Sequence, residues 1–199
     1  MILATIAAAL VLGTPSINDG PVKCAVMGTA TKANSKAAEY AGTRFPFCCG
    51  GCPEAFMKEP TKYLKAAAES NDVIGTYMFC PVSGEKIDLE KAKDTMDYKG
   101  VRYAFCCADD KATFAKDPAK FTKTPAKESL VCAVSGDKIA SYSEAAGYLD
   151  YDGVRYYTCC ADCLPALKKD PAGIIAKGKA KVSEPMAMPA PPAKTKKDG

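Results

Sequence analysis

Three copies of one pattern of cysteines, glycines and aromatic residues follow one another along this chain of 199 residues. Each copy opens with C-x-V-x-G and continues with Y-x-G-x-R-aromatic-x-x-C, followed by a second cysteine and a short apolar segment. The opening cysteines are Cys24, Cys80 and Cys132, which lie 56 and 52 residues apart. Repetition at such a period indicates an array of small structural units rather than one large domain.

The repeats set the expected domain organisation. We place the first unit at residues 21–66, the second at 77–123 and the third at 129–176. Residues 1–16 contain an apolar run that is too short to cross a bilayer but is typical of a secretory signal peptide. The tail at residues 177–199 is rich in Lys, Ala and Pro, and we expect it to be disordered. A secreted or periplasmic protein follows, with no stable membrane span after removal of the signal.

Local chemistry predicts the structure of each unit. The glycine of C-x-V-x-G can take positive φ, which lets the backbone form a tight turn, here called the knuckle, behind the cysteine. The motif Y-x-G-x-R-aromatic predicts a β-hairpin. The segment after the paired cysteines reads as a short helix that ends at Pro60, Pro118 or Pro171. The predicted fold class is α+β, with three tandem small units of knuckle, β-hairpin and short helix and a disordered C-terminal tail.

Cysteine placement predicts a site in each unit. All 11 cysteines lie in the repeats, and units of about 45 residues usually need a metal, a disulfide or a partner in order to fold. Cys48 and Cys52 are four residues apart across a turn that becomes a helix, so we expect them on one side, where Cys24 can face them. The matching set in the third unit is Cys132, Cys159 and Cys163. We also expect thiols near a helix N-terminus to have a lowered pKa, which favours metal binding.

The second unit differs at one position. Its matching set is Cys80, Cys106 and Asp110. A chain without histidine cannot build imidazole-rich copper or nickel sites, and thiolates favour Cu(I) or Zn(II). The carboxylate of Asp110 suits zinc and poorly suits Cu(I). The second site is therefore either mixed, or has lost its metal and keeps only the fold.

A second cysteine adjoins the strand-end cysteine in every unit. These residues are Cys49, Cys107 and Cys160. Because successive side chains of a strand point to opposite faces, we favour Cys48 and Cys159 as ligands. A Cys-x2-Cys pairing of Cys49 with Cys52, and of Cys160 with Cys163, stays open as the alternative. Otherwise the adjoining thiols are buried small residues or lie just outside the ligand set.

The three arginines of the chain occupy one repeat position, whereas the other 24 basic residues are lysines. They are Arg44, Arg102 and Arg155. A position that keeps arginine in a lysine-rich chain uses its planar guanidinium. Two roles fit: charge balance for the thiolates, or cross-strand pairing with a carboxylate or stacking on a ring. We favour the second.

These motifs resemble the YHS domain and the related TRASH domain. The resemblance rests on C-x-V-x-G, Y-x-G-x-x-Y-x-x-C-x3-C and closing segments such as "FMKEPTKY" (56–63) and "FAKDPAKF" (114–121), and it covers about 140 residues. It implies a small metal-binding module with a treble-clef-like fold and the cysteine sets above as ligands. The chain departs from the family at Asp110, in the third closing segment, and in lacking the Tyr-His-Ser run that names it.

Three functional hypotheses follow. The first is an exported metal-binding protein that sequesters or carries a soft ion, Cu(I) or Zn(II), with another exported protein as a candidate partner. The second is a structural or interaction module stapled by zinc or disulfides. The third is a thiol–disulfide oxidoreductase using "CGGC" (49–52) and "CADC" (160–163), although no βαβ context surrounds them. We favour the first, and we expect neither enzyme activity nor a nucleic-acid partner. The formal net charge of +4 by itself says little about nucleic acid.

Overall fold

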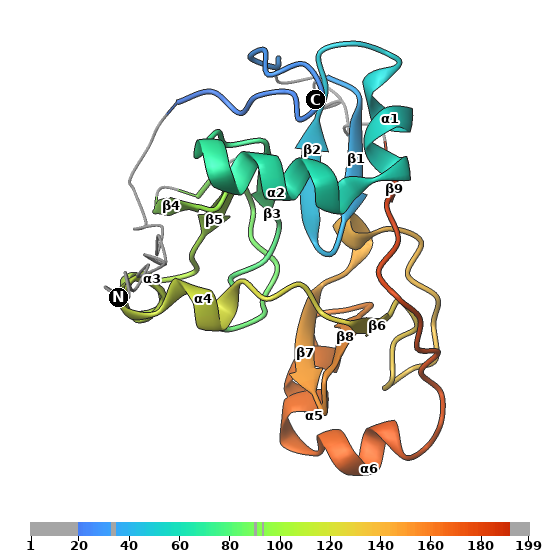
Figure 1. Cartoon of the computed structure of the whole chain (residues 1–199). Helices are drawn as coiled ribbons and strands as arrows, with labels where there is room; N and C mark the ends of the chain where they lie inside the picture. The colour runs from blue at the N-terminus through green and yellow to red at the C-terminus, as the bar shows by residue number, and fades with distance from the viewer. Residues whose placement is uncertain (1–19, 33–34, 90, 93, 192–199) are drawn as a thin grey trace, which may run out of the picture.

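The computed structural model describes residues 20–32, 35–89, 91–92 and 94–191. The predicted signal peptide at residues 1–16 lies outside the described residues. Within the described ranges, the protein is mixed α and β, with two sheets and six α-helices (Figure 1). None of these helices has both the length and the apolar character that a bilayer crossing requires.

Each unit contains an antiparallel hairpin, as the motif predicts. The strands are β1 (Ala37–Tyr40) with β2 (Thr43–Pro46), β4 (Thr95–Tyr98) with β5 (Val101–Ala104), and β7 (Gly147–Tyr151) with β8 (Val154–Thr158). Two residues join each pair of strands, and both have positive φ, for example 47° at Ala41 and 80° at Gly42. This is type I′ turn geometry, whose twist matches that of the flanking strands.

Two consecutive short helices close each unit. They are α1 (Cys52–Lys58) and α2 (Pro60–Ser70), α3 (Ala108–Lys116) and α4 (Pro118–Phe121), and α5 (Cys163–Lys169) and α6 (Pro171–Ile175). The first helix of each pair ends before the proline, as predicted. Sequence reasoning missed that the same proline opens a second helix, since its fixed φ suits the first helical position.

The units are joined through their strands. β3 (Gly75–Tyr77), which precedes the second knuckle, pairs with β2 of the first unit and β5 of the second. The resulting sheet has the order β4-β5-β3-β2-β1-β9. β6 (Lys127–Ser129), which precedes the third knuckle, pairs in parallel with β8 of the third unit only, in a separate sheet of order β6-β8-β7. The first two units therefore share one sheet.

The second and third units share a core. Tyr77 and Phe79 pack against Tyr148 and Tyr157, with ring centroids 5.6 to 6.2 Å apart. Backbone bonds reinforce this contact, because the amide of Tyr148 donates to the carbonyl of Gly84 at 2.8 Å. The first unit has its own cluster around Phe45, Phe47 and Phe56, and a third cluster lies around Leu167.

The C-terminal segment differs from our expectation of disorder over residues 177–199. β9 (Met188–Pro189) pairs with β1, and Ser183 exchanges two backbone hydrogen bonds of 2.8 Å with Glu128 of β6. Met188 also packs against the large core cluster. Residues 177–191 are ordered because sheet edges of two units supply partners for their backbone; residues 192–199 lie outside the described part.

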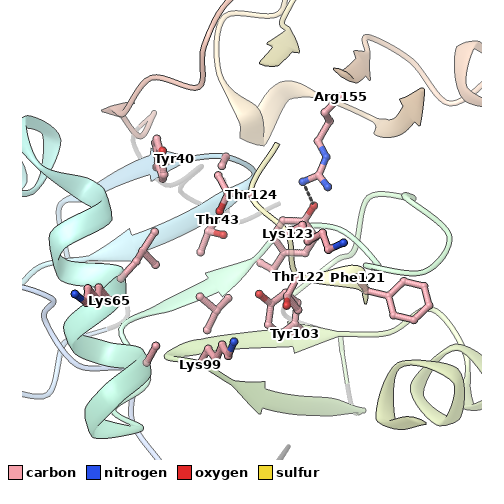
Figure 2. Close-up of a pocket in the computed structure, with 15 residues that line it drawn as sticks. Tyr40, Thr43, Lys65, Lys99, Tyr103, Phe121, Thr122, Lys123, Thr124 and Arg155 are labelled. Carbon is pink, nitrogen blue, oxygen red and sulfur yellow. Dashed lines mark hydrogen bonds between the residues drawn. The ribbon is translucent and has the colours of Figure 1, made fainter. Parts of the chain in front are cut away.

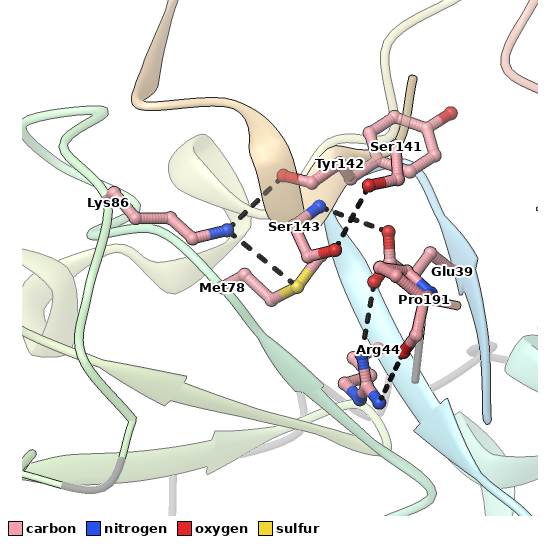
Figure 3. A network of polar contacts seen from close by, with 8 residues as sticks. All are labelled: Glu39, Arg44, Met78, Lys86, Ser141, Tyr142, Ser143 and Pro191. Carbon is pink, nitrogen blue, oxygen red and sulfur yellow. Dashed lines mark hydrogen bonds and ion pairs between the residues drawn. The ribbon is translucent and has the colours of Figure 1, made fainter. Parts of the chain in front are cut away.

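A polar network connects the three units and includes Pro191 of this segment (Figure 3). The fully buried carboxylate of Glu39 in the first unit pairs with Arg44 at 3.3 Å and accepts from the backbone amide of Ser143 in the third at 3.0 Å. Lys86 of the second unit donates to the carbonyl of Tyr142, at the start of the short 3-10 helix η1 (Tyr142–Glu144), at 3.2 Å. All three units meet here.

Candidate metal centres

The knuckle presents the first cysteine of each candidate site. In the first unit the amide of Cys24 donates to the carbonyl of Thr29 at 2.7 Å, and the amide of Gly28 donates back to Cys24 at 2.8 Å. The second and third knuckles have the same pair of hydrogen bonds, with donor–acceptor distances of 2.8 to 2.9 Å. Gly28 has φ of +68°, which a side chain disfavours. The turn thereby holds a fully buried thiol at its inner side.

Three side chains converge in the first unit. Cys24 comes from the knuckle, Cys48 follows β2, and Cys52 is the first residue of α1. One ligand atom from each lies within 4.8 Å of the others. The third unit brings together Cys132, Cys159 and Cys163 in the same way.

The sulfur spacing fits one soft metal ion. At a metal–sulfur distance of about 2.3 Å, two thiolates of one ion lie about 3.8 Å apart in a tetrahedral site and about 4.0 Å apart in a trigonal one. The Sγ atoms of Cys48 and Cys52 are 4.0 Å apart, and those of Cys159 and Cys163 are 3.9 Å apart. These two pairs of sulfur atoms are therefore already spaced as ligands of one ion, and the side chains need not move to bind it.

The second unit replaces one thiol by a carboxylate. A single oxygen of Asp110 lies 3.1 Å from the Sγ of Cys80 and 3.0 Å from the Sγ of Cys106. The three groups form the matching cluster, with atoms within 4.8 Å. Two sulfurs and one oxygen make a harder donor set than three sulfurs, which suits zinc better than Cu(I).

The adjoining cysteines lie at the rim of the sites. Cys49, Cys107 and Cys160 are exposed, so they are not the buried small residues that the sequence left open. The Sγ of Cys49 lies 3.1 Å from that of Cys52, and the Sγ of Cys160 lies 2.9 Å from that of Cys163. These distances are shorter than the spacing of two thiolates on one ion. The structure thus brings the adjoining thiol against one ligand rather than into the cluster of three.

The thiols of one site differ in pKa. Burial alone would raise the pKa of Cys132, but hydrogen bonds from backbone amides near Ser135 and Cys159 outweigh burial and lower it to about 7. The pKa of Cys24 is also lowered, by backbone hydrogen bonds that outweigh its burial. The backbone of the knuckle therefore favours the thiolate form of the knuckle cysteine.

The cysteines at the helix starts behave differently from our expectation. We predicted a lowered pKa for thiols near a helix N-terminus, but burial and then the neighbouring thiols raise the pKa of Cys52 and of Cys163. In the second unit, burial and then the hydrogen bond to Asp110 raise the pKa of Cys106 to about 12. Desolvation outweighs the effect of a helix of only seven residues at Cys52. A metal would have to displace these protons.

Two serines that we did not single out contact the sites. The hydroxyl of Ser135 lies 3.3 Å from the Sγ of Cys159, and that of Ser83 lies 3.7 Å from the Sγ of Cys106. Both stand at the fourth position of C-x-V-x-G, where the first unit has Met27. That recurrence was the available sequence signal.

The arginines contact carboxylates rather than thiolates. Each pairs with an acidic residue directly across its hairpin: Arg44 with Glu39, Arg102 with Asp97 and Arg155 with Asp150. The guanidinium of Arg155 also stacks over the ring of Tyr148, with its carbon 4.1 Å from the centroid. The favoured reading of cross-strand pairing is confirmed.

A separate cavity of about 250 Å³ lies where the three units meet (Figure 2). Its lining includes Tyr40 of the first unit, Tyr103 of the second and Arg155 of the third. No cysteine lines it, so it is distinct from the candidate metal centres.

Searches among protein-family models, curated proteins and solved structures found no match to this chain. The resemblance to YHS and TRASH domains therefore stays a prediction that rests on the motifs, as does the treble-clef assignment of each unit.

Proposed function

We propose that this chain is an exported metal-binding protein that sequesters or carries a soft ion, copper or zinc, at cysteine thiolate sites. One observation carries the proposal: the same three repeat positions bring their ligand atoms within 4.8 Å of one another in all three units. In each case a knuckle cysteine, more than 20 residues earlier in the chain, meets two residues from a strand end and a helix start that lie four residues apart. The motifs shared with YHS and TRASH domains support the same reading, and the apolar run in residues 2–13 supports export.

The residues have distinct roles in this proposal. In the first and third units, backbone hydrogen bonds lower the pKa of the knuckle cysteines Cys24 and Cys132, which favours the thiolate form that binds a metal. Cys52 and Cys163 release their protons as an ion binds, so binding strengthens as pH rises. The bound ion supplies charge neutralisation for the three thiolates.

The second unit selects a different ion in this proposal. Asp110 stands where the other units have a thiol, and a carboxylate oxygen is a better ligand for zinc than for Cu(I). We therefore expect Cu(I) at the first and third sites and zinc at the second when both ions are offered.

Native mass spectrometry of the reduced full-length chain, kept anaerobic, tests the proposal. We expect two ions in a Cu(I) titration and a third only when zinc is added. Cys52→Ser and Cys163→Ser should each lose one Cu(I), Asp110→Ala should lose the zinc, and Asp110→Cys should let the second unit take Cu(I). Cys107→Ser is the matched control and should bind like the wild type. A folded, fully reduced protein that binds neither ion would refute the proposal.

A structural role for zinc is the second candidate. It is favoured by the placement of the buried thiols, since Cys24 in the knuckle and Cys52 at the start of α1 are both buried, and one shared ion would link the two elements. If zinc is a staple, a chelator should unfold the units, as judged by far-UV circular dichroism. If the protein carries its ion, chelation should leave the fold intact.

A further inference from the structure

In each of two units, one thiol outside the metal cluster lies beside a thiol that belongs to it. Cys49 lies with its Sγ 3.1 Å from that of Cys52, and Cys160 with its Sγ 2.9 Å from that of Cys163. In both pairs one member is exposed and the other is a buried candidate ligand. The pairs arise in separate units from different intervening residues, Gly50 and Gly51 in one and Ala161 and Asp162 in the other. The recurrence is therefore a property of the fold.

We propose that Cys49–Cys52 and Cys160–Cys163 are reversible disulfide-forming pairs, and that oxidation removes one metal ligand from the first and third units while the second unit stays unchanged. The loss of metal rests on the proposed function; the disulfides themselves do not.

The exposed member starts the reaction because only it can be reached from solvent. The thiolate of Cys49 attacks one sulfur of a small-molecule disulfide, forming a mixed disulfide and releasing one thiol that takes up a proton. The sulfur of Cys52 then loses its proton and attacks the Sγ of Cys49. The Cys49–Cys52 bond forms, the mixed disulfide breaks, and a second small thiol leaves. Two protons and two electrons have passed to the small disulfide.

Competing pairs within each site are less favoured by the geometry. Cys48 lies 4.0 Å from Cys52, and Cys159 lies 3.9 Å from Cys163, so both are farther from the shared partner than the adjoining thiol. A bond of about 2.05 Å needs the smallest movement from the closer pair.

The second unit lacks the acceptor thiol. Cys107 occupies the position of Cys49, but Asp110 occupies that of Cys52, and a carboxylate cannot form a disulfide. Among the described residues, Cys107 is exposed and lies outside the cluster of Cys80, Cys106 and Asp110. Cys107 therefore serves as a matched exposed thiol that can form a mixed disulfide but cannot resolve it.

When a disulfide takes up Cys52 or Cys163, the metal site of that unit keeps only two thiolate ligands. The first site would keep Cys24 and Cys48, and the third would keep Cys132 and Cys159. Two ligands hold a soft ion less tightly than three, so oxidation should release the ion from these sites. The second site would keep its complete set.

The first test uses metal-free, reduced full-length protein. Incubation with oxidised glutathione, followed by alkylation and peptide mass mapping, should find disulfides at Cys49–Cys52 and Cys160–Cys163. Cys107 should carry glutathione or remain a free thiol, and Cys80 and Cys106 should be alkylated. Disulfides through Cys48 or Cys159 in their place, or the absence of both predicted bonds, would overturn the proposal.

Variants complete the test. The double variant Cys49→Ser and Cys160→Ser should form neither disulfide and should keep all its Cu(I) in oxidised glutathione, whereas the wild type should lose two ions and Cys107→Ser should behave like the wild type. If the reduced wild type forms the predicted disulfides but binds no metal at all, the proposed function fails and the disulfide pairs stand. If metal binds and the wild type and the double variant lose it equally, the release proposal fails and the metal sites stand.

Discussion

The three arginines show how one residue type at one repeat position can meet very different surroundings. The side chain of Arg155 is 5% exposed, makes two bonds of 2.7 and 2.8 Å to Asp150, and donates to the hydroxyl of Tyr77 at 2.8 Å. Arg44, at 28% exposure, reaches Glu39 only at 3.3 Å. Arg155 is therefore buried and held by several short contacts, whereas Arg44 is partly exposed and makes longer ones.

We expect Arg155→Lys to lower the free energy of unfolding by about 1–3 kcal/mol, because lysine keeps the charge but loses the bidentate contact and the stacking on Tyr148. Arg44→Lys, the matched variant, should cost less than about 1 kcal/mol. Urea unfolding of both variants under one metal condition measures the difference. Equal losses would contradict this account of Arg155.

Glu128 is a second residue whose environment has a measurable consequence. It is 2% exposed, it accepts from the hydroxyl of Tyr142, and within the described residues its other carboxylate oxygen has no hydrogen-bond partner. Burial raises its pKa from 4.5 to about 7, against the opposing effects of Tyr142 and Arg155. The folded protein therefore favours the protonated form.

Stability from Glu128 is accordingly complete below pH 4.5 and is lost as pH rises through about 7. The difference between the two pKa values corresponds to roughly 3 kcal/mol. We expect the free energy of unfolding to fall over this range in the wild type and to fall less in Glu128→Gln, which still accepts from Tyr142. Urea unfolding at several pH values measures both slopes. Glu54→Gln, at an exposed site, is the control and should keep the wild-type slope.

At the scale of elements, the three knuckles have the same backbone turn but pack against different neighbours. Gly28, Gly84 and Gly136 share its positive φ. A Cβ at Gly84 would lie 2.2 Å from the carbonyl oxygen of Tyr148, whereas a Cβ at Gly28 would have no atom within 4 Å. The second knuckle has become part of the contact with β7, and the first has stayed free of such contacts.

We expect Gly28→Ala to cost about 1 kcal/mol of stability through backbone strain alone. Gly84→Ala should cost at least about 2 kcal/mol more, because the backbone of the second and third units must separate to admit the methyl group. Thermal and urea unfolding of the two variants provide the comparison. A Gly84→Ala loss no larger than that of Gly28→Ala would show that this contact contributes little.

At the scale of the whole molecule, the C-terminal segment holds together units that are distant in sequence. It pairs with β1 of the first unit and with Glu128 at the start of the third, and Tyr142 donates to the carbonyl of Met186 at 3.4 Å. Arg44 donates to the carbonyl of Pro191 at 3.4 Å. These contacts belong to no single repeat.

Removal of residues 182–199 should therefore lower the free energy of unfolding by about 2–4 kcal/mol, through lost backbone pairing and the exposure of apolar surface around Met188. Removal of residues 192–199 alone retains every described contact and is the control. Urea unfolding and limited proteolysis report the effect. Truncated proteins of equal stability would show that the segment lies on the surface without holding the units.

The repeat pattern predicted the elements of each unit because the determinants are local. The glycine turns, the cysteine spacing and the helix-ending prolines act within a few residues, and so the hairpins and the convergence of Cys24 with Cys48 and Cys52 could be foreseen. The pairing of β3 with β2 and the order of the tail depend on partners more than 30 residues away. The raised pKa of Cys52 depends on burial, which spacing alone does not reveal.

The return of the final segment to β1 has a consequence for how such a chain can change over generations. A string of independent modules can gain or lose a copy at either end without harm to its neighbours. Here the outer edge of the first copy is already covered by the segment that follows the last. A duplicated fourth copy would push that segment out of reach, and a lost copy would leave it without its edge. The number three is thus built into the architecture, whereas a change inside one copy, such as aspartate at position 110 where the other copies have cysteine, leaves the strand order intact.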